Sequence, residues 1–434
     1  MSQTFLIAMK RFIATIFILS AALQIKAQNI QERIIKLAEG DAISQSAVSI
    51  CAIKGDGQKI VDINSSMMLV PASNMKLLST GAAIHHFGPE YRFETSLAHD
   101  GTIADGLLNG NLYIMGGGDP TLGSTDSIAP PIEETFSQWL DMLKEAGISQ
   151  INGKIIGDGN YFDAMIEQPT WLVEDVGTYY GAGTTGLMFY ENMQSFRVSA
   201  GAEIGDSVNI APSYPEVPWM EFRYNCTTGG KGTGDQLFMF TSELAPVAEI
   251  RGTFGVDRAA KRLDCSNKFP EYTCAYYFQE FLKRNGVECT GIGDFRLDKD
   301  WERNGDLSTL GTTLSPQLKR IVFETNHISN NVFAETLLRT LGREMTGSAC
   351  YDSSYVAINN VMTGLGVDTT RGARIKAKSG SMNGVRCYSG YIIPTDGSRE
   401  DVIIFSLMIN NCTASSTQMR NILDSMMAEL AAEN

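Results

Sequence analysis

Segments typical of β-strands lie near both ends of this 434-residue chain, and helical or glycine-rich sequence separates them. Near the start, SAVSICAI at 46–53 alternates apolar and small residues, turn residues follow at 54–57, and KIVDI occupies 59–63. This pattern predicts a β-hairpin. Near the other end, CYSGYIIP at 387–394 and VIIFSLMIN at 402–410 predict two more strands. Because isolated hairpins are marginal in water, we expect one sheet assembled from both ends of the chain.

Helices are predicted beside these strands, which gives an α+β fold. A short amphipathic helix is expected at 30–37, and a longer one runs from Ser73 to Phe87 with apolar residues at helical spacings. A last helix carries a single apolar stripe, the pattern of a helix that packs on a core. The stripe consists of Met419, Ile422, Leu423, Met426, Met427 and Leu430.

The middle of the chain has a different texture. Residues 93–300 are rich in glycine and in short β-like runs, with helices expected at 136–146 and 274–286. A chain of this length exceeds one ordinary core. We therefore expect a main domain built from 28–92 and 301–434, interrupted at 93–300 by one or two inserted β-rich domains. From about 301 the sequence becomes helical before the final strands.

The first 27 residues have the three parts of a signal peptide. Lys10 and Arg11 precede an apolar run at 12–23, and a small residue, Ala27, ends the segment. The apolar run is too short to cross a bilayer comfortably, and no other segment of the sequence is long and apolar enough. We expect an exported, periplasmic protein with a mature start near Gln28 and no transmembrane segment in the mature chain. The alternative is a buried N-terminal helix.

The charge of the chain argues against nucleic acid and anionic membrane as partners. The formal net charge is −14, and loss of residues 1–27 would remove three positive charges and no acid, giving −17. No basic cluster offsets this acidity. Nucleic-acid-binding proteins normally present such a cluster.

Cysteines and histidines do not form a metal-site pattern. The eight cysteines are widely spaced and lack the paired C-x-x-C signature of zinc sites. Cys265 and Cys274 are the nearest plausible disulfide pair, and free buried thiols are an equal alternative. Of only four histidines, the adjacent His85 and His86 point about a hundred degrees apart on a helix and cannot share one metal. We expect no metal and no cofactor. With only four histidines, the sequence also offers few candidates for a Ser-His-Asp triad.

The stretch LVPASNMKLLST at 69–80 begins a helix with a serine and a lysine on one face. Ser73 and Lys76 are one helical turn apart, so the lysine amine can act as the base that activates the serine hydroxyl if its pKa is lowered. The helix N-terminus offers free N–H groups to an oxyanion. This is the only S-x-x-K in the chain. The alternative is a helix cap followed by a solvent-exposed lysine.

Two further elements follow in the order that this chemistry requires. HISNNVFAETLL contains Ser329 and Asn331, and IKAKSGSMNG contains Lys378-Ser379-Gly380. Together with Ser73 and Lys76 they complete the set of three motifs, S-x-x-K, S-x-N and K-[TS]-G, that is found in penicillin-binding proteins and serine β-lactamases. Ser329 can relay a proton to the leaving group and Asn331 can hold the substrate amide.

The third element would bind the end of the substrate. Lys378 and Ser379 offer a cation and a hydroxyl to a terminal carboxylate, and Gly380 leaves room for substrate along the strand. The N–H groups of Ser381 and Ser73 would form the oxyanion hole.

From about residue 35 to the C-terminus the sequence resembles the low-molecular-mass class C penicillin-binding proteins, the D-alanyl-D-alanine carboxypeptidase/endopeptidase family. The 256-residue gap from Ser73 to Ser329 is similar to the family's, which houses inserted domains there. Further matching stretches are YIMGGGDPTL, INGKIIGDGNYFD, WLVEDVGTYYGA and SGYIIPTDG.

The resemblance implies a serine β-lactamase/transpeptidase-like domain, in which helices cover an antiparallel sheet. It implies cleavage of peptidoglycan stem peptides through an acyl-enzyme, with β-lactam antibiotics as covalent inhibitors. It also implies that Asp175, Tyr180 and Met382 line the pocket for the diamino-acid side chain of the stem peptide. Tyr180 as a core residue and Asp175 as a turn residue are the alternatives.

The chain departs from the family between the second and third elements. Lys378 follows Asn331 by only 47 positions, whereas the family has a longer segment with a D-G-S-G-L-S-R motif there, and the arginine of that motif, a further pocket residue, has no counterpart here. The segment around 364–378 is therefore shortened, either by a natural deletion or in the gene model. Two other functions remain as alternatives: a catalytically impaired cell-wall-binding homologue, and a β-lactamase or esterase on the same core.

Overall fold

The computed structural model describes residues 30–162, 165–168, 170–243, 245–294, 306–365, 381–382, 384–394 and 398–432. The predicted signal peptide lies outside these residues. Within them, no helix combines the length and the apolar character needed to cross a membrane. The chain divides into two compact units, the first formed by residues up to 75 and from 375 on, the second by residues 76–374.

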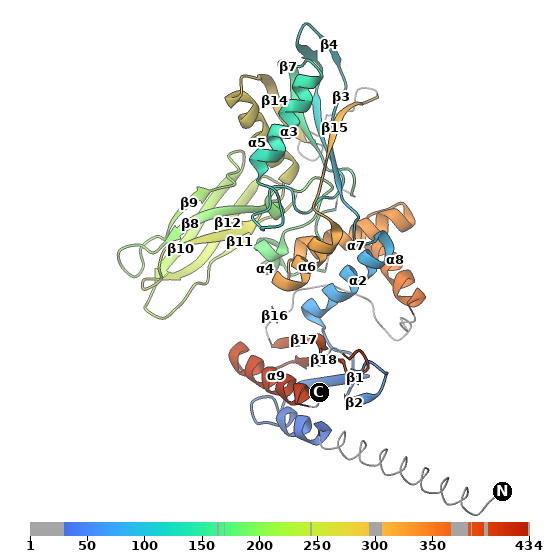
Figure 1. Ribbon diagram of the computed structural model, residues 1–434. Coiled ribbons are helices and arrows are strands. Elements are labelled where there is room, and N and C mark those ends of the chain that lie inside the picture. The colour runs from blue at the N-terminus through green and yellow to red at the C-terminus, as the bar shows by residue number, and fades with distance from the viewer. Residues whose placement is uncertain are drawn as a thin grey trace, which may run out of the picture. The chain divides into compact units, whose positions relative to one another are not determined.

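The first unit contains the sheet expected from both ends of the chain. Its five strands lie in the order β16-β17-β18-β1-β2, and all neighbours are antiparallel. The central contact pairs β1 with β18 over eight residues, from Ala47 opposite Asn410 to Lys54 opposite Ile403 (Figure 1). The strands are β1 (Ala47–Lys54), β2 (Lys59–Ile63), β16 (Ser381–Met382), β17 (Val385–Ile392) and β18 (Ile403–Asn410).

Two helices cover this sheet and close its core. Residues 30–38 are helical, and α9 (Ser416–Ala431) begins at a capping box in which Ser415 and Gln418 satisfy each other's backbone. Both helices place their apolar stripe against β1 and β18, as the sequence predicts. The shared core includes Ile30, Ile34, Ile50, Leu407, Met419, Leu423 and Met426.

The second unit is organised around a mixed seven-stranded sheet. Its order is β15-β3-β6-β7-β5-β4, and β14 also pairs with β7. The pairs of β7 with β5, β6 and β14 are parallel, and the others are antiparallel. The strands are β3 (Glu94–His99), β4 (Thr102–Ala104), β5 (Leu107–Asn109), β6 (Leu112–Gly116), β7 (Gln150–Asp158), β14 (Cys289–Asp294) and β15 (Ser308–Leu314).

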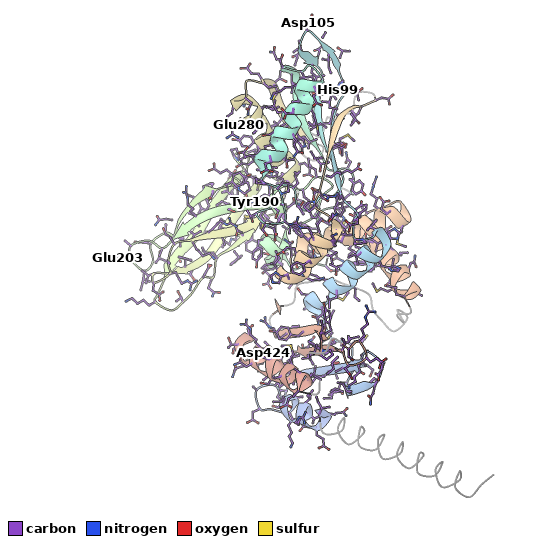
Figure 2. All side chains as sticks on the ribbon, viewed as in Figure 1. His99, Asp105, Tyr190, Glu203, Glu280 and Asp424 are labelled. Atoms are coloured by element: carbon purple, nitrogen blue, oxygen red, sulfur yellow. The ribbon has the colours of Figure 1, made fainter. Side chains whose placement is uncertain are left out.

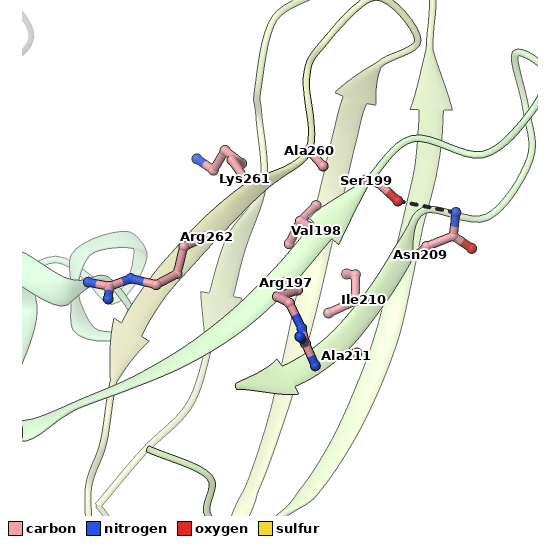
Figure 3. Close-up of a pocket in the computed structure, with 9 residues that line it drawn as sticks. All are labelled: Arg197, Val198, Ser199, Asn209, Ile210, Ala211, Ala260, Lys261 and Arg262. Carbon is pink, nitrogen blue, oxygen red and sulfur yellow. Dashed lines mark hydrogen bonds between the residues drawn. The ribbon is translucent and has the colours of Figure 1, made fainter. Parts of the chain in front are cut away.

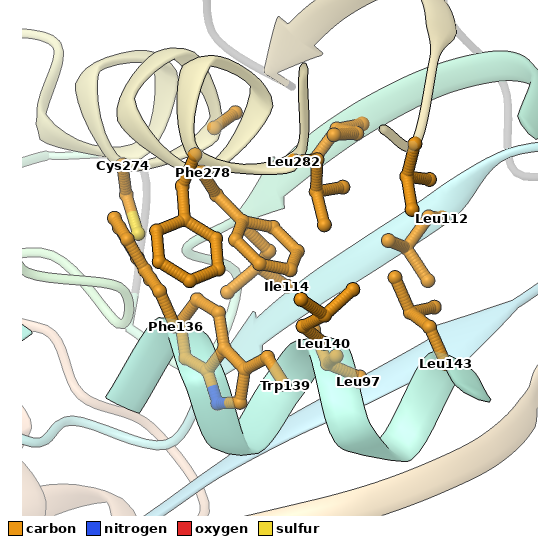
Figure 4. Packing of buried hydrophobic residues seen from close by; sticks show 14 of the residues in the cluster. Leu97, Leu112, Ile114, Phe136, Trp139, Leu140, Leu143, Cys274, Phe278 and Leu282 are labelled. Atoms are coloured by element: carbon orange, nitrogen blue, oxygen red, sulfur yellow. The ribbon is translucent and has the colours of Figure 1, made fainter. Parts of the chain in front are cut away.

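Helices α3 (Ile132–Glu145) and α5 (Pro270–Arg284) pack on this sheet through aromatic rings. The centroid of the Trp139 ring lies 5.4 Å from that of Phe136 and 5.1 Å from that of Phe278, which crosses it edge to face (Figure 4). The indole N–H of Trp139 donates to Thr313 Oγ1 at 3.2 Å. Both helices begin earlier than expected, since Pro131 and Pro270 suit the start of a helix.

Two three-stranded sheets form the rest of the β-rich middle. One has the order β10-β12-β11 and the other β13-β8-β9, and they share a core that includes Phe196, Ile250 and Phe254. Glu203, between β8 and β9, and Asp105, between β4 and β5, lie exposed on this unit (Figure 2). The strands are β8 (Met193–Ser199), β9 (Asn209–Ser213), β10 (Glu221–Gly229), β11 (Phe238–Phe240), β12 (Val247–Gly255) and β13 (Lys261–Ser266).

A group of helices completes the second unit: α2 (Met75–Phe87), α6 (Leu318–Ile328), α7 (Asn331–Thr346) and α8 (Tyr351–Gly364). Ala83 of α2, Leu318 of α6 and Phe333 of α7 meet in one buried cluster. Shorter helical turns of this unit lie at α4 (Val173–Val176), η2 (Tyr179–Gly181) and η3 (Tyr190–Asn192), and the turn η1 (Ala72–Asn74) belongs to the first unit. These helices and turns carry most of the residues singled out by the sequence.

Two expectations change in detail. The sequence after 301 was expected to be helical, but Ser308–Leu314 forms β15 and pairs with β3. Its sequence, STLGTTL, is polar but rich in β-branched threonine, which suits an exposed edge strand. All eight cysteines, each of them among the described residues, are free, so the alternative of free thiols applies to Cys265 and Cys274. The boundaries at 92 and 300 stay a prediction.

Candidate active site

Ser73 lies in the 3₁₀ turn η1, directly before α2. The preceding residue, Ala72, has φ +49°, a conformation that costs a residue with a Cβ about 1–2 kcal/mol. Ala72 is buried against Val385 and Cys387 of β17, which holds this turn in place within the first unit. The division between the two units follows Met75, so Ser73 belongs to the first.

Lys76 is buried in the second unit, with 6% of its surface exposed. Its Nζ donates a hydrogen bond to Ser329 Oγ at 3.3 Å. Burial lowers the pKa of the Lys76 amine to about 8, and the negative charge of Glu335 opposes this effect. The alternative of a solvent-exposed lysine is therefore wrong, and the amine has the property that a general base needs near neutral pH.

Ser329 lies at the junction of two helices. It ends α6 in the left-handed conformation, with φ 62° and ψ 38°, and Asn330 begins α7 as its N-cap. A serine in this region is uncommon, and such strain is typical of functional positions. The sharp junction directs Ser329 Oγ to Lys76 Nζ.

Asn330, the middle residue of the S-x-N element, has a structural role. Its side-chain oxygen accepts from Phe333 N at 3.1 Å, and its Nδ2 donates to Glu191 Oε2 at 2.7 Å. Burial raises the pKa of Glu191. Asn330 therefore both caps α7 and fixes it to the turn η3.

We expect Asn330→Ala to lower the free energy of unfolding by about 1–2 kcal/mol, because a cap and a hydrogen bond to a buried acid are lost together. Urea unfolding followed by circular dichroism measures the change. Asn330→Asp keeps the cap acceptor but turns a carboxylate toward Glu191, so it should also destabilise, and more strongly as the pH rises. Equal stability of all three proteins would contradict this role.

Asn331 Nδ2 donates to the backbone oxygen of Tyr180 at 2.7 Å. Tyr180 is partly buried in η2, and Asp175 is buried in α4, where its backbone oxygen accepts from Thr178. Both line a cavity of about 500 Å³ together with Phe238 and Phe240 of β11. The structure thus joins the S-x-N element to the segment predicted to bind the stem peptide, although the contact to Tyr180 uses its backbone.

The third element can be described only in part. Lys378, Ser379 and Gly380 lie outside the described residues. Ser381 and Met382 form β16 and pair with Arg386 and Val385 of β17. Their backbone therefore lies at the edge of the five-stranded sheet.

Sequence reasoning missed a group of polar residues on α7 and α8. Glu335 lies one helical turn after Asn331 on α7, and Arg339 follows one turn later. Tyr351 of α8 donates a hydrogen bond to the backbone oxygen of Ile166 at 3.4 Å, and its ring lies against the Arg339 guanidinium. The signal was available: an acid four residues after the S-x-N asparagine falls on the same helix face.

A second cavity, of about 550 Å³, lies on strands β8, β9 and β13 (Figure 3). None of the predicted site residues lines it. Its Arg262 pairs with Asp264 at 2.8 Å, and its Ser199 Oγ accepts from Asn209 Nδ2 at 3.4 Å. It offers no serine beside a base. Among the described residues, no three His, Cys, Asp or Glu side chains are grouped as metal ligands.

Comparison with protein families assigns the chain. The model of the D-Ala-D-Ala carboxypeptidase 3 (S13) family matches residues 28–374, well over half of the sequence. The chain belongs to this family. The match includes the first two elements of the S13 site and ends four residues before Lys378.

Known S13-like proteins resemble it at low identity. The D-alanyl-D-alanine carboxypeptidase of Actinomadura sp. (strain R39) is 27% identical over 320 residues, which cover 72% of this chain and 57% of that protein. The penicillin-sensitive carboxypeptidase A of Dictyostelium discoideum is 22% identical over 450 residues, which cover 86% of this chain and 84% of that protein. The chain thus spans less than two thirds of the Actinomadura relative.

A solved structure has the same fold. Penicillin-binding protein 4 (dacB) from Haemophilus influenzae superposes with a TM-score of 0.74 at 18% identity, covering 92% of this chain and 99% of that one. This confirms the expected α+β fold with additional β-rich parts.

Proposed function

We propose that the protein is a serine D-Ala-D-Ala carboxypeptidase/endopeptidase that cleaves peptidoglycan stem peptides through an acyl-enzyme. The observation that carries the proposal is the buried Lys76 amine, whose lowered pKa and 3.3 Å contact with Ser329 suit proton transfer. Membership of the S13 family supports the same reaction.

In the proposed reaction Ser73 Oγ attacks the carbonyl carbon of the penultimate residue while Lys76 Nζ takes its proton. The tetrahedral intermediate then expels the terminal D-Ala, or the cross-linking amine, which receives a proton through Ser329. Water hydrolyses the resulting ester and regenerates the Ser73 hydroxyl. The three-residue spacing of Ser73 and Lys76 along the chain supports their pairing.

Substrate binding is assigned from the remaining motif residues. Asn331 would hold the substrate amide, and its fixed contact with the Tyr180 backbone supports a defined orientation. Lys378 and Ser379 would bind the terminal carboxylate, and the N–H groups of Ser73 and Ser381 would stabilise the oxyanion. Gly380 would leave room for the substrate.

The diamino-acid side chain would lie against Asp175, Tyr180 and Met382. The cavity of about 500 Å³ that Asp175 and Tyr180 line is large enough to take such a side chain. The negative charge of an Asp175 carboxylate would also attract the positively charged amine of a diamino acid.

β-Lactams would acylate Ser73 because they present a strained amide to the same nucleophile. The H. influenzae protein has been solved in complex with a novel β-lactam, and the superposition with this chain has a TM-score of 0.69. We also propose export to the periplasm by the N-terminal signal peptide, since the substrate is outside the cytoplasm.

The test is labelling of the purified protein with a fluorescent penicillin. We expect one covalent adduct in the wild type, none in Ser73→Ala, and wild-type labelling in Ser137→Ala, which removes an exposed serine of α3. A folded wild-type protein that forms no adduct would overturn the proposal and favour the cell-wall-binding alternative. Rapid turnover of a chromogenic cephalosporin would favour the β-lactamase alternative.

A further inference from the structure

The connection between β13 and α5 runs through the interior of the second unit, although it consists only of residues 267–269. Asn267 and Lys268 have no exposed surface, and neither has Ser266 at the end of β13. Connections normally lie on the surface, because buried polar groups must find hydrogen-bond partners inside the protein. Neither the three motifs nor the proposed reaction uses this segment, so its buried polar residues need another explanation.

Lys268 is the charged residue of this connection. Its Nζ forms an ion pair with Glu167 Oε1 at 2.5 Å, and the Glu167 side chain is 17% exposed. A buried ammonium group is stable in its charged form only beside an anion or hydrogen-bond acceptors. The same Nζ donates a hydrogen bond to the backbone oxygen of Gly181 at 3.3 Å. Lys268 therefore joins the segment around Glu167 to the turn η2.

The turn η2 contains the carbonyl that binds the S-x-N asparagine. Gly181 directly follows Tyr180, whose backbone oxygen accepts from Asn331 Nδ2 at 2.7 Å. Gly181 also packs closely on Asp175, since a Cβ added at Gly181 would lie only 1.9 Å from the Asp175 backbone oxygen. The hydrogen bond from Lys268 thus acts one residue away from the carbonyl that orients Asn331.

Other buried side chains bind the chain on both sides of η2. Before the turn, Ser266 Oγ donates to the backbone oxygen of Val176 at 2.7 Å. After the turn, Asn192 Nδ2 donates to the backbone oxygen of Gly183 at 2.8 Å. Lys268 binds the turn between these two anchored points, where its long side chain reaches the carbonyl from the interior.

We propose that Lys268 is a positioning residue, which holds η2 where the Tyr180 carbonyl orients the Asn331 side chain for the substrate amide. The inference rests on the proposed function for the role of Asn331, but the order of η2 can be measured without any reaction. A carbonyl only accepts, so the Tyr180 oxygen turns the nitrogen of the Asn331 amide toward η2. A displacement of η2 would therefore displace the Asn331 amide as well.

The first experiment measures η2 directly, by hydrogen exchange and mass spectrometry of the full-length protein. The N–H groups of residues 181 and 182 donate within the turn, so their exchange reports its opening. We expect Lys268→Met to accelerate exchange of a peptide covering 178–184 about tenfold. Lys283→Met, which removes an exposed lysine of α5 paired with Glu280 at 2.8 Å, should leave this exchange unchanged.

A double variant covers the case in which Lys268→Met does not fold. Loss of the lysine alone leaves the Glu167 carboxylate without its cation, whereas Lys268→Met combined with Glu167→Gln removes both charges. Replacing a buried ion pair with neutral side chains is often tolerated. The double variant also lacks the hydrogen bond to Gly181, so it should show the same faster exchange. Unchanged exchange of 178–184 in the folded variants would overturn the proposal.

Penicillin acylation tests whether Lys268 acts through Asn331. We expect Lys268→Met to slow acylation about tenfold, because the amide of the ligand is held less well. The variant that combines Lys268→Met with Asn331→Ala should react no more slowly than Asn331→Ala alone, since the first substitution then has nothing left to displace. Two independent effects would multiply instead, and a further tenfold loss in the combined variant would overturn the proposal.

The two readouts separate this inference from the proposed function. If the wild type is not acylated at all, the proposed function fails, while faster exchange in Lys268→Met still supports the hold of Lys268 on η2. If the wild type is acylated and Lys268→Met reacts at the same rate, Lys268 has a structural role only and the proposal fails.

Discussion

Lys76→Met is expected to react with a fluorescent penicillin about 10³-fold more slowly than the wild type at pH 8. Methionine is unbranched like lysine, only one heavy atom shorter, and apolar, so it fits the buried position but cannot accept the Ser73 proton. Stopped labelling reactions resolved on gels give the rate. Lys144→Met, which removes an exposed lysine paired with Asp141 at 3.1 Å, is the matched control and should react like the wild type.

The same property predicts the pH dependence of the wild type. With a Lys76 pKa of about 8, about a tenth of the molecules carry the neutral amine at pH 7. This fraction falls about tenfold for each unit by which the pH is lowered further. The acylation rate should therefore rise with pH up to about 8 and then level off. A rate that is constant from pH 6 to pH 9 would contradict the assignment of Lys76 as the base.

Stability measurements separate this effect from misfolding. The pKa of Lys76 is lowered from 10.5 to about 8 in the folded protein, so its titration reduces stability as the pH falls from 10.5 to about 8, and the full effect is present below that pH. Replacing it with methionine should leave the thermal unfolding temperature unchanged or raise it. A large decrease would mean that slow labelling reflects loss of structure.

Trp139→Ala is expected to lower the free energy of unfolding of the second unit by about 3–5 kcal/mol, because a fully buried indole is removed from the core. The substitution leaves a cavity between Phe136 and Phe278, and the hydrogen bond to Thr313 is lost. Urea unfolding followed by far-ultraviolet circular dichroism measures the change, since the tryptophan itself is no longer available as a fluorescent probe.

Phe323→Ala is the control, because it also replaces an aromatic side chain with alanine, but at an exposed position. Phe323 lies on α6 of the same unit and is 67% exposed, so its loss should change the free energy of unfolding by no more than about 0.5 kcal/mol. Similar effects of the two substitutions would mean that Trp139 is not part of a cooperative core.

Much of the fold could be predicted because periodicity and turn residues act locally. The alternation of 46–53, the turn at 54–57 and the apolar stripe of 419–430 predicted β1, β2 and α9. The single sheet from both ends of the chain followed from the need of strands for partners. The polar edge strand β15 could not be predicted, since its pairing with β3 rather than its own pattern makes it a strand.

The candidate site divides in the same way. The sequence alone determined which residues to propose. The spacing of Ser73 and Lys76 and the order of the three motifs are local features that need no knowledge of the fold. Only the tertiary structure decided that Lys76 is buried and bonded to Ser329, and that Asn331 meets the Tyr180 backbone. Burial and long-range contacts set a pKa, and both depend on residues that are hundreds of positions apart in the chain.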